Sequence, residues 1–342
     1  MSDPTLQAFW MVFLFVIGLC VGSFLNVMAL RFLADEPIVL PPSHCPQCNS
    51  PLRAIDNIPV ISYLLLGGQC HYCKTPISIQ YPLVELATAM LFCGTVWFFG
   101  LTWQSAFLLF MISNLIVIFI TDLRESLIFN FNSIYMLIPA GLLYSVLNLG
   151  NTAGTAFTLD LGALVLHVPE ALISALMAML ISVVFFEGMI LFSRLCFGTD
   201  GFGHGDTFLM MGAGAFLGWP LTVLALLLGF VVQTIPAIPM LVIQWIKNKQ
   251  YTSLISGAVA LAGGGSPLIL MNTPFSPESK TLISLICLVI SVIALIVFLK
   301  QVRTAQTFTY LPLGPALVLG ILVSLFFGQD IISLYQGYLL RN

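Results

Sequence analysis

Long apolar segments, each close to the length of a membrane span, constrain this chain more than any other feature. A helix needs about 20 apolar residues to cross a hydrocarbon core of about 30 Å. Composition agrees, because 59% apolar and 7% charged residues exclude a soluble globular domain. The candidate segments lie near residues 9–31, 83–100, 104–121, 127–148, 170–192, 207–219, 221–246, 252–272, 281–299 and 312–335. We therefore predict an all-α polytopic membrane protein, a bundle of about 8–10 transmembrane helices.

Two of these segments are weaker than the rest. The segment at 207–219 is short, and 252–272 contains the glycine-rich stretch 263–267, which favours a re-entrant or interfacial segment. The first segment, 9–31, is too long for the apolar part of a signal peptide and lacks a basic start and a cleavage site. We therefore expect it to be a retained membrane helix.

The distribution of basic residues predicts the orientation of the bundle. With the N-terminus outside, only Lys280 and Arg341 of the eleven Lys and Arg residues fall outside the cytosol. The cytosolic group consists of Arg31, Arg53, Lys74, Arg124, Arg194, Lys247, Lys249, Lys300 and Arg303. These cations are scattered and the formal net charge is −3, so there is no basic stripe for nucleic acid. We expect contact with membrane lipid and no nucleic-acid partner.

Polar segments divide the chain into three predicted parts. Residues 1–31 form the first transmembrane helix, and residues 32–81 form a polar cytosolic island. Residues 82–342 form the remaining transmembrane bundle. The island is the largest polar segment of the chain, and it is therefore the best candidate for a separate module.

Four cysteines give this island its chemistry. Cys45 and Cys48 form one CxxC pair, Cys70 and Cys73 form another, and 21 residues separate the pairs. Two such pairs complete a closed tetrahedral site, so we predict a structural zinc centre. A metal would also supply stability that about fifty residues with few large side chains cannot obtain from a core. Two disulfides or a redox pair are the alternative, although reduced cytosolic thiols favour the metal.

Two aspartates stand where apolar segments meet polar ones. Asp122 precedes Leu123 and Arg124, and Asp206 ends the stretch Gly203–Asp206. Carboxylates near a bilayer are costly unless they are paired or hydrated, so they are functional-site candidates. Two carboxylates on one membrane face can share a proton and activate a water molecule between them. Glycines at 203 and 205 would let the backbone bend tightly and bring Asp206 to its partner.

Structural roles compete with this interpretation. The aspartates would then only cap helices or pair with Arg124 and Arg194 at the lipid headgroups. His204 is either a hydrogen-bonding neighbour of the aspartates or a solvated loop residue. Glu187, inside an apolar segment, either lines a path for substrate or water or is a neutral buried acid. Glu85 and Asn26 are candidate polar packing contacts.

Several motifs resemble those of one known family, the bacterial type IV prepilin peptidases, which are GxGD aspartic proteases. Residues 18–27 (GLCVGSFLNV) resemble the opening helix of this family, and the resemblance continues over about seventy residues. GHGD at 203–206 is similar to its GxGD signature. Further matching segments are SHCPQC (43–48), DNIPVISY (56–63), GQCHYC (68–73), YPLVE (81–85) and LPLGPA (311–316).

The resemblance implies a function. Members remove the short basic leader of prepilins and pseudopilins, substrates of type IV pilus and type II secretion systems, at the cytosolic face of the bacterial inner membrane. Their catalytic aspartates correspond to Asp122 and Asp206. Members with the four-cysteine module are also N-methyltransferases that use S-adenosylmethionine. No nucleotide-binding glycine motif in this sequence supports that second activity independently.

The chain departs from the family pattern in three places. Ile128-Phe129-Asn130 lacks the usual proline of Ile-Pro-Asn, and Thr207-Phe208 replaces Val-Lys after the second aspartate. The chain is also longer than typical members, which we attribute to an added helix at 281–299, with or without 252–272. Substrate contacts are the property that these changes are expected to alter.

Two other functions fit parts of the sequence. An ion-coupled transporter or channel would use Asp122, Asp206 and Glu187 as an ion path through broken helices. A non-catalytic scaffold would recruit pilin-like helices through faces of small residues. The position of both aspartates at the membrane rim rather than at its midplane favours the protease.

Overall fold

Helices form almost all of the secondary structure, because backbone groups in lipid must satisfy their own hydrogen bonds. In this computed structural model, the described residues are 4–40, 42–147, 155–160, 165–198, 201–248 and 312–339, with short helical pieces between 251 and 294.

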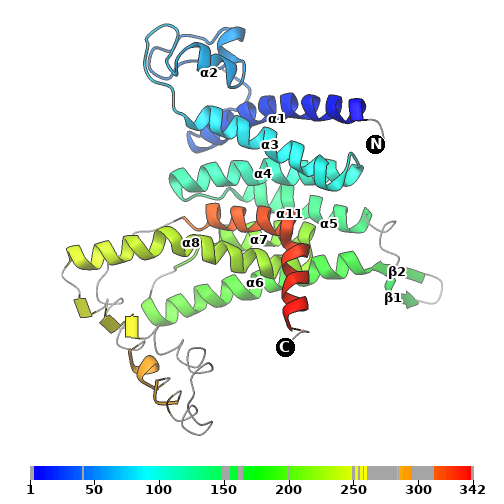
Figure 1. Cartoon of the computed structure of the whole chain (residues 1–342), viewed down its shortest axis with the longest axis vertical. Coiled ribbons are helices and arrows are strands. Elements are labelled where there is room, and N and C mark those ends of the chain that lie inside the picture. Colours follow the sequence, from blue (N-terminus) through cyan, green and yellow to red (C-terminus); the bar gives the residue numbers. More distant parts are fainter. Residues whose placement is uncertain are drawn as a thin grey trace. The chain divides into compact units, whose positions relative to one another are not determined.

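Six of the described helices are long and apolar enough to cross a membrane. They are α1 (Pro4–Leu33), α3 (Gln80–Phe99), α4 (Trp103–Glu125), α6 (Glu170–Phe197), α8 (Trp219–Lys247) and α11 (Gly314–Leu339) (Figure 1). Shorter elements are the π-helix η2 (Phe131–Leu137), which continues into α5 (Ile138–Leu147), and α7 (His204–Leu217). The predicted polytopic helical membrane protein is thereby confirmed. The windows 252–272 and 281–299 lie largely outside the described residues.

A short β-hairpin interrupts the helical pattern. Strand β1 (Thr155–Asp160) pairs antiparallel with β2 (Val165–Pro169), with Thr158 opposite His167. The sequence predicts only α-helical structure here. The β-branched and aromatic residues of these strands suit an extended conformation, and the hairpin adds a small feature to the helical class.

The chain divides into two compact units. The first contains residues 1–187, 203–230 and 312–342, and the second contains residues 188–202 and 231–311. All of the residues of the candidate site described below belong to the first unit. The second unit contains the ends of α6 and α8.

Within the first unit, α4 is the central helix. It packs against α1, α3 and α11, and Figure 1 shows it between α3 and α11. In its most apolar stretch 56% of the residues are buried, against 22% for α1. Met111, Ile112 and Leu115 are completely buried. The helix that carries Asp122 is therefore surrounded by protein, whereas α1 is available to lipid.

Helices α1 and α3 approach each other closely through small residues. A Cβ atom at Gly18 would lie 2.5 Å from the Cα atom of Ala89, and one at Gly22 would lie 2.8 Å from the Cα atom of Glu85. Small residues four positions apart allow this kind of backbone contact between membrane helices. The pair therefore forms a fixed support for the polar segment that joins its two helices.

We predict that Gly18→Ala destabilises the protein, although alanine is the better helix former. The added methyl group meets backbone atoms that cannot rotate away, so we expect a loss of about 1–3 kcal/mol. Thermal unfolding of the purified protein measures it. Gly188→Ala is the matched control, because a Cβ atom there would have no neighbour within 4 Å. Equal unfolding temperatures for both variants would contradict the close packing.

Candidate functional site

Asp122 and Asp206 come from different helices of the first unit. Asp122 lies three residues before the end of α4, and Asp206 lies in the first turn of α7. Their residues are 5% and 8% exposed. Asp122 lies close enough to Asp206 for their charges to interact. Neither carboxylate forms an ion pair within the described part of the chain, so the pairing of Asp122 with Arg124 that we considered does not occur.

The end of α4 is shaped around Asp122. Ser126 adopts a left-handed conformation with φ of 52°, and its N–H donates to the backbone oxygen of Asp122 at 2.9 Å. This is a common way to end a helix. The chain then turns back along η2, which packs against both α4 and α7.

Glycines allow α7 to lie against the returning chain. A Cβ atom at Gly205 would lie 2.8 Å from the Cβ atom of Ile128, and one at Gly212 would lie 2.6 Å from the Cβ atom of Leu137. Gly203 differs from these two glycines. Its φ is −90°, and a Cβ atom there would lie 3.9 Å from its nearest neighbour, the backbone nitrogen of Gly205. The close approach predicted for these glycines therefore rests on Gly205, whereas Gly203 makes no strained bend.

Gly314, at the start of α11, is a third part of the site. A Cβ atom there would lie within 2.5 Å of Oδ2 of Asp122, and the backbone N–H of Gly314 hydrogen bonds the same carboxylate group. A side chain at this position would displace the aspartate. The segment LPLGPA (311–316), which contains Gly314, is the sequence signal for this part of the site, but its residues alone do not predict a contact with Asp122.

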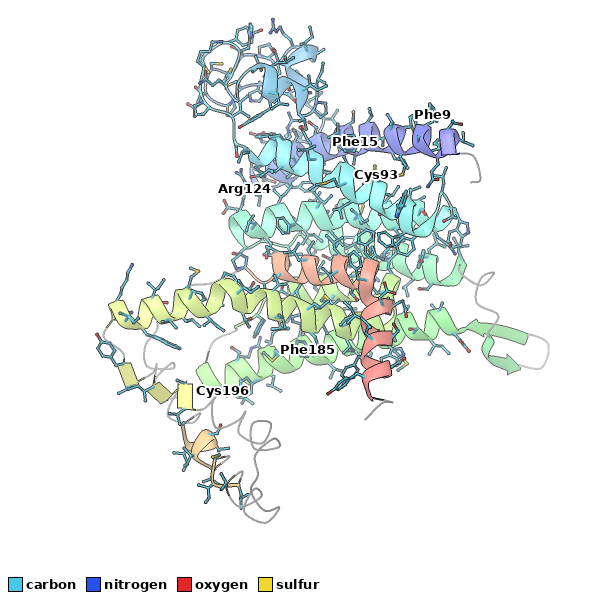
Figure 2. All side chains as sticks on the ribbon, viewed as in Figure 1. Phe9, Phe15, Cys93, Arg124, Phe185 and Cys196 are labelled. Atoms are coloured by element: carbon cyan, nitrogen blue, oxygen red, sulfur yellow. The ribbon has the colours of Figure 1, made fainter. Side chains whose placement is uncertain are left out.

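A polar chain links Arg124, two residues after Asp122, to the first two long helices. The guanidinium of Arg124 donates to Oε1 of Gln80 at 2.6 and 3.0 Å, and Nε2 of Gln80 donates to Oδ1 of Asn26 at 2.8 Å. Figure 2 shows Arg124 at the same end of the bundle as the polar segment between α1 and α3. The predicted packing role of Asn26 agrees with this contact. Asp122 therefore lies at the end of the bundle that carries the cysteines.

His204 and Glu187 form a pair that the sequence analysis missed. Nδ1 of His204 lies 3.0 Å from Oε1 of Glu187, and the side chains are 58% and 45% exposed. The idea that Glu187 is a neutral buried acid was therefore wrong. Since Glu187 joins α6 to the first residue of α7, it braces the helix start that carries Asp206.

The four cysteines form one cluster. The sulfur atoms of Cys45, Cys48, Cys70 and Cys73 all lie within 4.8 Å of one another. Sγ of Cys45 is 3.8 Å from Sγ of Cys73. Tetrahedral coordination with metal–sulfur bonds of about 2.3 Å separates the sulfurs by about 3.8 Å. The residues present therefore fit a four-coordinate metal ion.

The two CxxC turns have the same backbone design. Asn49 and Lys74 follow their turns in the left-handed conformation, with φ of 55° and 59°. Each N–H donates to the oxygen of the first cysteine of its turn, at 2.8 and 3.1 Å. The hydroxyl of Thr75 hydrogen bonds Cys73 at 3.2 Å and lowers the pKa of this exposed thiol to about 6. A lowered pKa favours the thiolate, which is the form that binds metal.

Glu85 connects this cluster to the membrane helices. Its Oε2 accepts a hydrogen bond from the backbone N–H of Val60 at 2.7 Å, and the Ser23 hydroxyl hydrogen bonds the same carboxylate. Val60 has φ of 62°, which is unusual for a β-branched residue. Glu85 thus holds a strained turn beside the short helix α2 (Ile61–Leu65), and its role as a polar packing contact is clear.

Comparison with known sequences gives these sites a context. Residues 16–99 match the Bacterial Peptidase A24 N-terminal domain, and residues 109–238 match the Type IV leader peptidase family. Asp122 and Asp206 fall in the second region, and the four cysteines fall in the first. The chain belongs to the Type IV leader peptidase family.

Individual relatives support the assignment. The prepilin leader peptidase/N-methyltransferase of Pseudomonas aeruginosa is 35% identical over 66% of this chain and 79% of its own length. The protein of the same name from Stutzerimonas stutzeri is 32% identical over 72% of this chain and 86% of its own length. The Myxococcus xanthus protein is 37% identical over 61% of this chain, but this match spans only 56% of its own length. No solved structure matches the chain significantly.

We predict that removing the metal loosens residues 34–79 and leaves the bundle folded. Metal binding supplies folding free energy in modules of this size, because the site does not exist in the unfolded chain. Limited proteolysis after chelation should cut within this segment, and Cys48→Ser should have the same effect. Cys20→Ser is the control, because Cys20 lies outside the cluster. An unchanged cleavage pattern after the metal is lost would argue against a folding role.

Proposed function

We propose that this protein is a membrane aspartic endopeptidase that removes the basic leader peptide from type IV prepilins or pseudopilins. The single observation that carries the proposal is the burial of Asp122 and Asp206 at one end of the bundle, within range of each other's charge. The membership of the chain in the leader peptidase family and the printed names of its relatives point to the same substrates.

The chemistry follows from two neighbouring carboxyl groups. Like charges held close together in a site of low polarity cannot both ionise cheaply, so one group keeps its proton. The ionised group removes a proton from water, and the water oxygen attacks the scissile carbonyl carbon. The protonated group donates to the carbonyl oxygen, and the amide nitrogen leaves with a proton when the intermediate collapses. No acyl-enzyme forms.

We place the site at the cytosolic face of the bacterial inner membrane. The distribution of basic residues favours this orientation, and the substrate leader is itself basic and cytosolic. A prepilin anchored by its own transmembrane helix would approach through the bilayer, which raises its local concentration and orients the scissile bond. Residues 32–81 then form a cytosolic module beside the site, held to it through Glu85 and Gln80.

Zinc is the metal we assign to the module. Four thiolates in a closed tetrahedral set favour zinc among the ions that are compatible with reduced thiols. A closed site leaves no position for water, so the metal has a structural role and takes no part in peptide hydrolysis.

The two alternative functions, an ion-coupled transporter or channel and a non-catalytic scaffold, are less consistent with these contacts. In a transporter, Glu187 would be a member of an ion path together with the two aspartates. Its carboxylate is instead bound to His204. A non-catalytic scaffold would not require two buried carboxylates beside one another, because such a pair is costly without a chemical role.

We predict that Asp122→Asn and Asp206→Asn each reduce prepilin cleavage by about 100- to 10,000-fold, because either change removes one proton-transfer group. The measurement is leader removal from a purified prepilin in detergent or liposomes. Asp330→Asn, an exposed aspartate on α11, is the control and should cleave normally. Full cleavage by either of the first two variants would exclude the proposed pair.

We also propose N-methylation of the new N-terminus from S-adenosylmethionine, on the basis of the names that the relatives carry. The described residues contain no strand that runs into a glycine-rich loop, so they offer no Rossmann-type site for this cofactor. Transfer of labelled methyl to the cleaved pilin tests the activity. We expect the Asp122→Asn variant to methylate a pilin that is supplied already cleaved. If the wild-type protein transfers no label to that pilin, the proposed methyltransferase activity is refuted.

A further inference from the structure

The four-cysteine module exposes large aliphatic side chains, although its sequence predicts a polar island. Three of the five residues of α2 are Ile61, Leu64 and Leu65, which are 52%, 70% and 75% exposed. Single exposed aliphatic residues are ordinary on a protein surface, whereas a group of them marks a contact site. The module has five more, which are Val39, Leu40, Ile55, Ile58 and Ile79. This group therefore indicates an apolar partner.

The exposed residues of α2 share one face of the helix. Ile61, Leu64 and Leu65 are spaced three and four positions apart, which places them on the same side. Tyr63 lies on the opposite side and packs against the module, because a Cβ atom at Gly68 would lie 3.0 Å from its hydroxyl oxygen. The helix thus turns its apolar face away from the rest of the module.

Hydrogen bonds fasten the module to the ends of two membrane-spanning helices. The backbone N–H of Val60, directly before α2, donates to the carboxylate of Glu85 in the second turn of α3. At the other end of the module, the guanidinium of Arg31 in the last turn of α1 donates to the backbone oxygens of residues 37 and 38. The exposed residues that follow these contacts are therefore held close to the place where the chain enters the membrane.

The surface of α3 that is available to lipid continues into the module. Leu83, Met90 and Trp97 are exposed and are spaced seven positions apart, or about two turns, whereas Phe92 on the opposite face is buried. Ile79, at the start of α3, has helical φ and ψ of −63° and −14° and lies one turn before Leu83. Its exposed side chain extends the same stripe beyond the helix. The lipid-facing stripe and the module therefore present one continuous apolar surface.

Charge and size identify lipid as the occupant of the α2 face. A basic leader peptide would be recognised by carboxylates, and this face has none. A stable interface with another protein buries ~800 Å² per partner, which three side chains of a five-residue helix cannot supply. Attraction to anionic headgroups is also weak, because residues 32–81 have more acidic than basic side chains. These are Asp35, Glu36 and Asp56 against Arg53 and Lys74.

We propose that Ile61, Leu64 and Leu65 insert into the bilayer interface, so that the four-cysteine module rests on the membrane surface. An apolar helix face of this kind lies about 5–10 Å into the boundary between headgroups and acyl chains. The inference goes beyond the proposed peptidase function and is independent of it. It fixes the module at the depth where the leader of a membrane-anchored protein leaves the bilayer.

The test places a fluorescent side chain on this face. The variant Leu65→Trp is reconstituted in liposomes whose lipids are brominated near the headgroup end of the acyl chains, and the emission of the five native tryptophans is subtracted. We expect bromine to remove about half of the added emission, because the face lies at that depth. Gln47→Trp, an exposed position in the first CxxC turn, is the control and should lose none. Metal content and prepilin cleavage confirm that both variants are folded.

A second variant removes the apolar contact without a probe. Leu64→Ser combined with Leu65→Ser should raise the rate of proteolysis within residues 34–79 about tenfold in liposomes, because the module loses apolar area that lipid covers. Its metal content should stay the same. High salt should alter neither this rate nor the quenching, since an apolar contact is not screened by ions.

Four outcomes would overturn the proposal. Absence of quenching in Leu65→Trp would mean that the α2 face lies in water, and equal quenching in Gln47→Trp would mean that another face meets the membrane. Quenching that disappears at high salt would indicate an electrostatic contact. If the added tryptophan is shielded only when prepilin is present or when the protein is concentrated, the occupant is a protein. Full cleavage by Asp122→Asn would refute the proposed function but would leave the quenching result unchanged.

Discussion

The burial of two carboxylates within range of each other's charge, in a bundle with very few other charges, is the constraint on which the rest of the structure depends. Such groups are costly in an apolar environment. Gly314 on α11 lets the backbone lie directly against Asp122, and Gly205 lets the start of α7 lie against Ile128. Ser126 ends α4 soon after Asp122, so that this carboxylate lies near the end of its helix.

The four-cysteine module and the helix of the first aspartate are connected by hydrogen bonds. Gly18 and Gly22 bring α1 against α3, and this support carries Glu85, which binds the strained turn at Val60. On the same side of the bundle, Oε1 of Gln80 accepts a hydrogen bond from the guanidinium of Arg124, which lies two residues after Asp122. Two polar contacts therefore connect the module with the helix that carries the first aspartate.

The environment of the second aspartate is different. The start of α7 is braced by the Glu187–His204 pair, which is about half exposed, and by the contact between Gly205 and Ile128. An exposed pair of this kind contributes little to the free energy of unfolding. Its main effect is therefore to orient the start of α7, which carries Asp206. The departures from the family pattern fall in this region. Thr207, where the family has valine, is one of these departures, and its side chain is buried next to Asp206 in the sequence.

The sequence alone was sufficient for the helical membrane class and for most of the spans, because the length of an apolar segment is a local property. The CxxC spacing was likewise sufficient for the four-cysteine cluster, since both pairs lie on short local turns. Asp122 and Asp206 were selected as candidates from their local context. Their roles in catalysis remain proposals.

Contacts between distant segments required the tertiary structure. Periodicity and composition do not state which helix faces which, so the approach of Gly314 to Asp122 and the pairing of Glu187 with His204 were not predicted. The π-helical winding of η2 was missed for a related reason, because it is selected by packing against α7 rather than by local propensity. The sequence by itself determined which segments are apolar enough to span a membrane and which residues are candidates for the chemistry. Only the packing of helices decided which polar groups meet, because that choice depends on the close fit of surfaces far apart along the chain.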